Sequence, residues 1–73
     1  MSHRVEGVVK WFNAARGYGF VVDNTEDSEQ YFVHFTSIMM DGYKTLEEGQ
    51  KVEFTLRSTP KGVQAVDVVI LPQ

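Results

Sequence analysis

Short runs of strand-forming residues, separated by turn residues, limit most strongly what this chain of 73 residues can fold into. Apolar and polar side chains alternate along these runs, and none has the spacing of three and four that an amphipathic helix needs. The pattern predicts five strands, over residues 5–13, 18–23, 30–35, 50–58 and 63–71. Five strands in so small a chain predict a closed barrel, because closure hides the edges of the sheet.

Length and composition set further bounds. A chain of this size forms one domain, expected over residues 1–73, and buries only about 60% of the surface that its unfolded form exposes. The absence of cysteine excludes disulfides and thiolate zinc sites. No hydrophobic run reaches the length of a signal peptide or a membrane span. We therefore expect a cytoplasmic protein with no membrane partner.

The formal charge of −3 is unevenly distributed along the chain. Residues 5–20 carry a local charge of +1, whereas residues 23–29 contain four acids and no base. Exposed charges are screened beyond about 8 Å at physiological salt, so the local charge matters more to a ligand than the total does. The net charge weakens a nucleic-acid interpretation without excluding it. The acidic segment is expected to be a solvated loop that mildly opposes phosphate binding.

The second and third predicted strands place a set of rings on one face, because side chains alternate across a strand. If Val21 and Val33 point into the barrel, four rings point outward: Tyr18, Phe20, Phe32 and His34. Gly17 and Gly19 flank Tyr18, and glycines there would let a flat ligand come close.

Alternation alone is equally consistent with burial of these rings in the core. The balance shifts because the chain offers enough other core residues: Val5, Val9, Val21, Val33, Ile38, Val52, Phe54, Leu56, Val66 and Val68. Exposed rings are platforms on which bases stack whatever their sequence. The sequence therefore favours an aromatic surface for stacking, with cations at its edge.

Four motifs follow in order over nearly the whole chain: KWFN at 10–13, RGYGF at 16–20, YFVHF at 31–35 and KTLEEG at 44–49. Together they resemble the cold-shock domain, and the second and third are similar to its two ribonucleoprotein motifs. The resemblance implies an all-β, five-stranded antiparallel barrel of the oligonucleotide-binding type. It also implies binding of single-stranded RNA and DNA, without a cofactor, and a role as an RNA chaperone or antiterminator in cold or stress response. The implied binding positions are Lys10, Trp11, Phe12, Arg16, Tyr18, Phe20, Phe32, His34, Phe35, Tyr43 and Lys61.

Two of these positions conflict with strict alternation, which would bury Trp11 and Phe35; a bend or a strand end would turn them outward. The chain also departs from the usual family pattern. Val8 stands where a Lys is common, Gln30 stands where an Asp is common, and the loop between the two ribonucleoprotein-like motifs is about two residues longer than in short members. These departures leave the rings in place but bear on affinity and base preference.

Other interpretations remain open at this point. MDGY at 40–43 and PKG at 60–62 resemble the stationary-phase, replication-inhibiting branch of the family, although Val33 and Phe35 differ from it. The RNA-recognition motif shares the pattern at 16–21, but Asp23 stands where its last aromatic belongs, and its two helices are absent from the predicted pattern.

A small enzyme would depend on His34 beside the acidic loop, but no nucleophile or metal cluster accompanies it, and His3 and His34 are too few for a metal site. We therefore expect no catalysis and no small-molecule substrate. A peptide-binding barrel would also use exposed rings. Against it, Lys10, Arg16 and Lys61 suit a phosphate backbone. A monomer is expected, with a dimer as the alternative.

Overall fold

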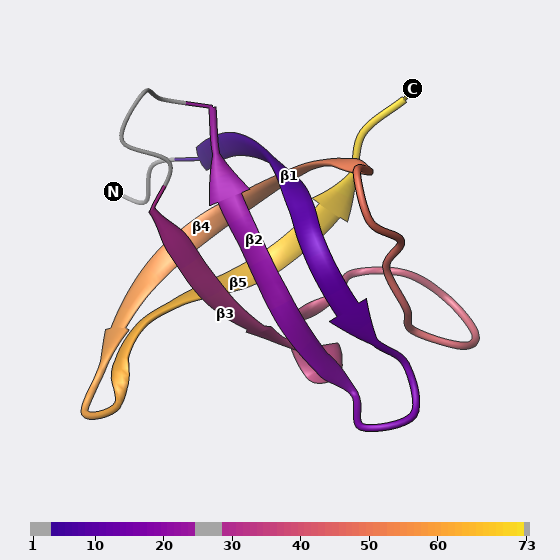
Figure 1. Cartoon of the computed structure of the whole chain (residues 1–73), viewed down its shortest axis with the longest axis horizontal. Helices are drawn as coiled ribbons and strands as arrows, with labels where there is room; N and C mark the ends of the chain where they lie inside the picture. Colours follow the sequence, from indigo (N-terminus) through magenta and orange to yellow (C-terminus); the bar gives the residue numbers. More distant parts are fainter. Residues whose placement is uncertain (1–3, 25–28, 73) are drawn as a thin grey trace.

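The computed structural model describes residues 4–24 and 29–72, and its strands form a closed barrel in the order β1-β2-β3-β5-β4 (Figure 1). The elements are β1 (Arg4–Asn13), β2 (Tyr18–Asp23), β3 (Gln30–His34), the short 3₁₀ helix η1 (Phe35–Ser37), β4 (Lys51–Thr59) and β5 (Gly62–Ile70). Each predicted strand end lies within one residue of the observed end. The all-β barrel is confirmed.

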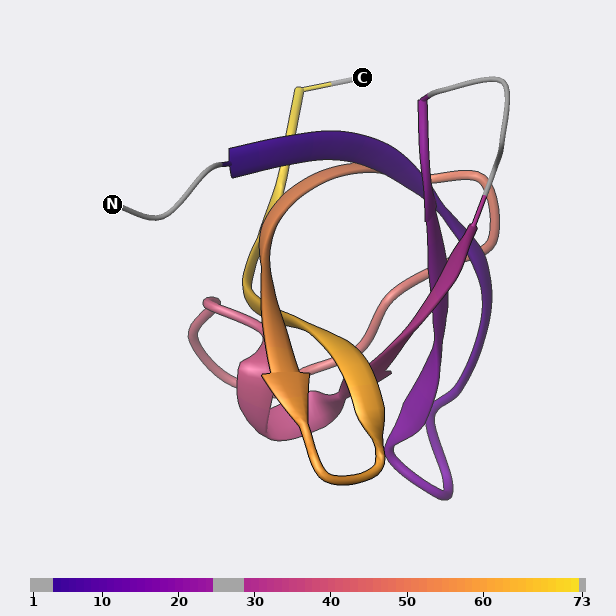
Figure 2. The ribbon, with the colours of Figure 1, turned by 90° about the vertical axis from the view of Figure 1, so that its left-hand side faces the viewer.

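The described strands pair antiparallel except where the barrel closes. There β3 runs parallel to β5, with Phe32 opposite Gln64. In the five-stranded antiparallel barrel that the resemblance implied, this closing pair is the one parallel pair of described strands. Figure 2 shows how the strongly curved β1 and β4 wrap around the interior. The connection from η1 to β4 runs along one side of the barrel, near the turn between β1 and β2 (Figure 1).

The barrel interior is filled by side chains from every strand and from the long connection. The buried core consists of Val9, Val21, Tyr31, Val33, Ile38, Leu46, Val52, Phe54, Ala65 and Val68. The predicted core residues Val5 and Leu56 are partly buried against it. None of the four rings predicted to point outward belongs to this core; they are Tyr18, Phe20, Phe32 and His34.

Val66 was wrongly predicted as a core residue. Val66 pairs with Thr55, but Val69 pairs with Glu53, so β5 holds one more residue than β4 between these pairs. Asp67 adopts a positive φ of 52° in this bulge. An extra residue reverses the alternation, and Ala65 and Val68 therefore point inward while Val66 stays half-buried.

A second bulge lies in β1 and turns Trp11 outward. Val9 pairs with Val21 and Trp11 pairs with Phe20, so Lys10 is the extra residue. Trp11 consequently lies on the same face as Phe20, and Phe12 packs partly against the core instead of sharing the face of Lys10. This bulge is the predicted bend that turns Trp11 outward.

The two glycines of the RGYGF segment make room for protein atoms. That they also admit a flat ligand stays a prediction. A Cβ on Gly19 would lie 2.6 Å from the Cα of Phe12, and one on Gly17 would lie 2.7 Å from Cδ1 of Phe35. Real Cβ atoms do not approach other atoms so closely. These glycines therefore hold β1 close to β2 and seat the ring of Phe35 beside the turn.

Candidate nucleic-acid interface

Six rings form one continuous cluster on the outer face of β1, β2 and β3. We call this cluster the aromatic platform; its members are Trp11, Tyr18, Phe20, Phe32, His34 and Phe35. Strand register creates it, since Trp11 lies opposite Phe20, Phe20 opposite Phe32, and Tyr18 opposite His34. Their inward neighbours, Val21 and Val33, are fully buried in the core.

Each ring of the platform lies within contact distance of at least one other. The ring centroids are 5.4 Å apart for Trp11 and Phe20, 5.8 Å for Trp11 and Tyr18, and 5.9 Å for Phe20 and Phe32. Tyr18 stacks on Phe32 at 5.7 Å, and Phe32 on His34 at 6.5 Å. Such contacts fix the rings in place before a ligand arrives.

The platform remains accessible although its rings touch. Trp11 exposes 37% of its surface and Phe35 exposes 41%, while the other four rings are half-buried. Phe35 escapes burial because β3 ends at His34 and Phe35 begins η1. A half-buried ring with one open face is the arrangement on which an unpaired base can stack.

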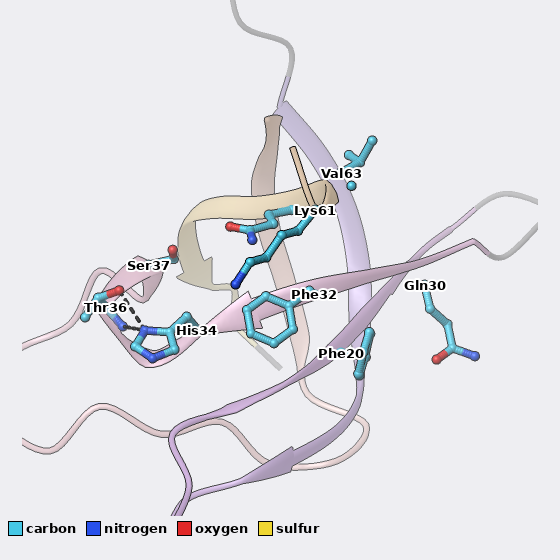
Figure 3. Close-up of a pocket in the computed structure, with 10 residues that line it drawn as sticks. Phe20, Gln30, Phe32, His34, Thr36, Ser37, Lys61 and Val63 are labelled. Atoms are coloured by element: carbon cyan, nitrogen blue, oxygen red, sulfur yellow. Dashed lines mark hydrogen bonds between the residues drawn. The ribbon is translucent and has the colours of Figure 1, made fainter. Parts of the chain in front are cut away.

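His34 is oriented by the turn that follows it. Its Nδ1 accepts a hydrogen bond from the backbone N–H of Thr36 at 3.4 Å and lies 2.9 Å from the Thr36 hydroxyl, which can donate to it (Figure 3). With Nδ1 acting as an acceptor, the proton of the neutral ring is on Nε2. His34 therefore offers a ring face for stacking and an N–H donor to a base or phosphate oxygen.

A groove runs along the platform between β3 and the β4–β5 turn. We call it the first groove; it is lined by Phe20, Gln30, Phe32, His34, Thr36, Ser37, Lys61, Gly62, Val63 and Gln64. In Figure 3 the side chain of Lys61 extends over the groove towards Phe32 and His34. Lys61, a predicted binding residue, is thereby brought to the rings by the β4–β5 turn.

A second groove continues beyond Phe35. It is lined by Ala14, Ala15, Arg16, Gly17, Phe35, Gly42, Tyr43 and Lys44. Tyr43 exposes 71% of its surface, and its hydroxyl donates a hydrogen bond to the carbonyl of Ala14 at 3.2 Å. This bond links the long connection to the β1–β2 turn, so that Tyr43 and Arg16 flank the same groove.

The charged side chains that line the two grooves are positive, whereas the net charge of the chain is negative. Lys61 lines the first groove, Arg16 and Lys44 line the second, and neither lining includes an aspartate or glutamate. Lys10 is exposed beside Trp11. The net charge of −3 therefore does not describe the surface around the rings.

Two carboxylates lie within hydrogen-bond reach of a buried tyrosine. The hydroxyl of Tyr31 lies 3.2 Å from Oε2 of Glu29 and 3.4 Å from Oδ2 of Asp23. Burial, followed by the charge of Asp23, raises the pKa of Tyr31 to about 12. Of the acidic loop, Glu26 and Asp27 lie outside the described residues, so its predicted effect on binding stays a prediction.

The structure brings most of the predicted binding residues to one surface. All eleven have exposed or half-exposed side chains. Ten of them lie on the platform, in a groove or beside Trp11, whereas Phe12 packs partly against the core. Sequence reasoning missed Lys44 and Gln64. The neighbour Tyr43 was a signal for Lys44, whereas Gln64 reaches the groove only through the parallel pairing with Phe32.

Two further features concern residues 4–24 and 29–72. That part of the chain contains no group of three or more His, Cys, Asp or Glu side chains able to hold a metal ion. It also contains no helix that is long and apolar enough to cross a membrane.

The fold and the ring-lined surface define a small β-barrel built to bind nucleic acid. The family described as the 'Cold-shock' DNA-binding domain matches residues 5–71, and the chain belongs to this family. It is 57% identical to cold shock protein 1 of Lactiplantibacillus plantarum over 63 residues, 86% of this chain and 92% of that protein. It is 49% identical to the cold shock-like protein CspB of Escherichia coli K12, over 96% of this chain and 97% of that protein.

A solved structure shows the same fold at greater distance. The Drosophila Unr CSD456 structure superimposes with a TM-score of 0.77 at 24% identity, over 96% of this chain and 27% of that chain. Family membership assigns the class of function: this chain is a nucleic-acid-binding protein of the cold-shock family and is not an enzyme. The family also implies single-stranded nucleic acid as the ligand.

Proposed function

We propose that this chain binds single-stranded RNA and DNA by stacking unpaired bases on the aromatic platform while cations at its edges contact the backbone. The observation that carries the proposal is the continuous cluster of six rings with two flanking grooves whose linings hold cations and no carboxylate. Each stacked base contributes about 1–3 kcal/mol by alanine substitution. Three or four such contacts give useful affinity without many ion pairs.

The proposed binding residues are those of the platform together with the cations and the ring at its edges: Lys10, Trp11, Arg16, Tyr18, Phe20, Phe32, His34, Phe35, Tyr43 and Lys61. Phe12, the remaining predicted binding residue, belongs to the same proposal; its half-buried ring also packs partly against the core. The whole chain acts as one cold-shock domain, as a monomer in the cytoplasm. Its role is that of an RNA chaperone or antiterminator in cold or stress response, which is typical of the family.

A second role rests on the same surface. The exposed Tyr43 and the groove residue Lys61 belong to the MDGY and PKG segments, which resemble the replication-inhibiting branch. Inhibition of DNA replication by binding single-stranded DNA is therefore the alternative role. A helix-containing RNA-recognition motif is excluded, because η1 is the only helix in the described part of the chain. A peptide ligand is the alternative of another class.

The test uses Trp11, the single tryptophan of the chain, which lies in the platform. Titration with a short pyrimidine-rich single strand should quench its fluorescence as a base stacks near the indole. The matched duplex should bind far more weakly, because its base faces are already stacked on one another. Equal affinity for the duplex, or no binding of either, would contradict the proposal.

A further inference from the structure

Two methionines that are adjacent in sequence lie in different surroundings on the connection between η1 and β4 (Figure 1). Met39 exposes 61% of its surface, whereas Met40 is half-buried and packs against the core. Both line a surface hollow, which we call the methionine hollow; its other lining residues are Thr36, Ile38, Asp41 and Lys44. One thioether side chain is therefore open to solvent, and its neighbour is partly shielded from it.

The exposure of Met39 is fixed by the backbone on which it lies. The N–H of Met39 donates a hydrogen bond to the carbonyl of Val68 at 2.8 Å, and Ile38 forms a parallel bridge with Val68. Ile38 is extended and its side chain is buried in the core. Successive side chains of an extended segment point to opposite sides, so the buried Ile38 directs Met39 outward.

The sulfur chemistry of this chain is confined to methionine, because the chain has three methionines and no cysteine. Hydrogen peroxide oxidises a thioether to a sulfoxide: the sulfur lone pair attacks one peroxide oxygen, the O–O bond breaks, and the second oxygen leaves as water. Sulfur loses two electrons and the peroxide gains them. The product is a polar side chain, and it is unfavourable where the thioether packed against apolar atoms.

We propose that Met39 is a site of reversible oxidation by peroxide, that it reacts before Met40, and that its sulfoxide leaves the barrel intact. A sulfoxide at Met39 projects into water and stays accessible to the reductases that restore methionine. At Met40 the same oxygen would lie against the core and loosen the connection, which also carries Tyr43 and Lys44 to the second groove. The inference concerns oxidation and stability and does not depend on nucleic-acid binding.

The experiment treats the parent with hydrogen peroxide and follows sulfoxide at each position by mass spectrometry, using fragment ions that separate Met39 from Met40. In the folded protein Met39 should be oxidised faster than Met40 by about fivefold or more, because susceptibility follows exposure. In guanidinium chloride, which unfolds the chain, the two rates should become equal. Incubation with methionine sulfoxide reductases should then return Met39 to the thioether in the folded protein.

Met39→Leu and Met40→Leu are the matched variants, since leucine and methionine have similar volumes and exchange at little cost. With limiting peroxide, Met39→Leu should carry more sulfoxide at Met40 than the parent does. With excess peroxide, the thermal unfolding midpoint of the parent and of Met39→Leu should fall by about 4 °C or more. That of Met40→Leu should stay within about 2 °C of its untreated value.

Three results would overturn the inference. The first is equal oxidation rates of Met39 and Met40 in the folded protein, or a ratio of rates that guanidinium chloride leaves unchanged. The second is a midpoint that falls as far in oxidised Met40→Leu as in the oxidised parent, because the loss would then not arise at Met40. The third is an unchanged midpoint in a parent whose Met40 is fully converted to sulfoxide.

Discussion

Phe20 and Phe54 are chemically identical side chains with opposite roles. Phe20 is half-buried in the platform, whereas Phe54 is fully buried in the core. We expect Phe20→Ala or Phe32→Ala to weaken single-strand binding by about 1–3 kcal/mol each, because a stacked base loses its partner. Folding should survive both. Fluorescence titration, together with thermal unfolding, measures the two effects.

Phe54→Ala is the matched control for these ring deletions. Loss of a fully buried ring should cost about 3–5 kcal/mol of stability through the cavity it leaves. If Phe20→Ala were instead as destabilised as Phe54→Ala, the platform rings would be core residues and the stacking account would be wrong.

Ionisation of Tyr31 makes the stability of the barrel depend on pH in the alkaline range. Its pKa in the folded state is raised to about 12 by burial and by the charge of Asp23, above the ordinary value of 10. A raised pKa means that folding favours the protonated phenol, so this contribution to stability is complete below pH 10 and is lost as the pH rises through 12. The free energy of unfolding should therefore fall more steeply between pH 10 and 12 in the parent than in Tyr31→Phe.

Absorbance at 295 nm supplies an independent check. The parent should show phenolate formation near pH 12 that Tyr31→Phe lacks. If the phenolate that Tyr31→Phe lacks formed near pH 10, the ordinary value, Tyr31 would not be buried against the carboxylates.

The contact between β1 and β2 positions Trp11 and depends on Gly19. Gly19→Ala would place a Cβ 2.6 Å from the Cα of Phe12, and backbone atoms cannot move aside as a flexible side chain can. We expect a loss of about 1–3 kcal/mol of stability, as for other overpacked sites, together with a shift in Trp11 fluorescence. Denaturant unfolding followed by Trp11 emission measures both.

Gly49→Ala is the control for Gly19→Ala, because a Cβ there meets no atom within 4 Å although φ is 85°. It should cost about 1–2 kcal/mol from the left-handed backbone alone and leave Trp11 emission unchanged. An unchanged stability of Gly19→Ala would contradict the close packing of the two strands.

How far the sequence predicts this fold depends on whether local alternation holds. Alternation places Val21 and Val33 inside, and thus Phe20 and Phe32 outside, because β2 and β3 are regular where they carry the rings. It fails at Trp11 and Val66, since each bulge is defined by a partner strand distant in sequence. The family resemblance recovered Trp11. Gln64 could not be predicted, because a parallel pair across the barrel closure brings it to the rings.

Across the whole molecule, net charge and local charge differ: the chain is acidic, but the charged side chains that line the two grooves are cations. The linings of the two grooves contain Lys61, Arg16 and Lys44, while the carboxylates of Asp23 and Glu29 lie at the hydroxyl of the buried Tyr31. An acidic protein can therefore bind a polyanion where the local charge is positive, provided that stacking supplies most of the affinity. Few cations predict a weak dependence on salt.

The salt dependence of single-strand binding tests this division most directly. Each phosphate neutralised contributes a slope of about −0.7 to the logarithm of affinity against the logarithm of salt concentration, so Lys61, Arg16, Lys44 and Lys10 together limit the slope to about −3. Arg16→Gln should flatten this slope by up to about 0.7. Phe20→Ala should lower the affinity at every salt concentration and leave the slope unchanged. A parental slope much steeper than −3, or a Phe20→Ala variant that binds as tightly as the parent, would contradict the account by showing that backbone charge, not stacking, holds the strand.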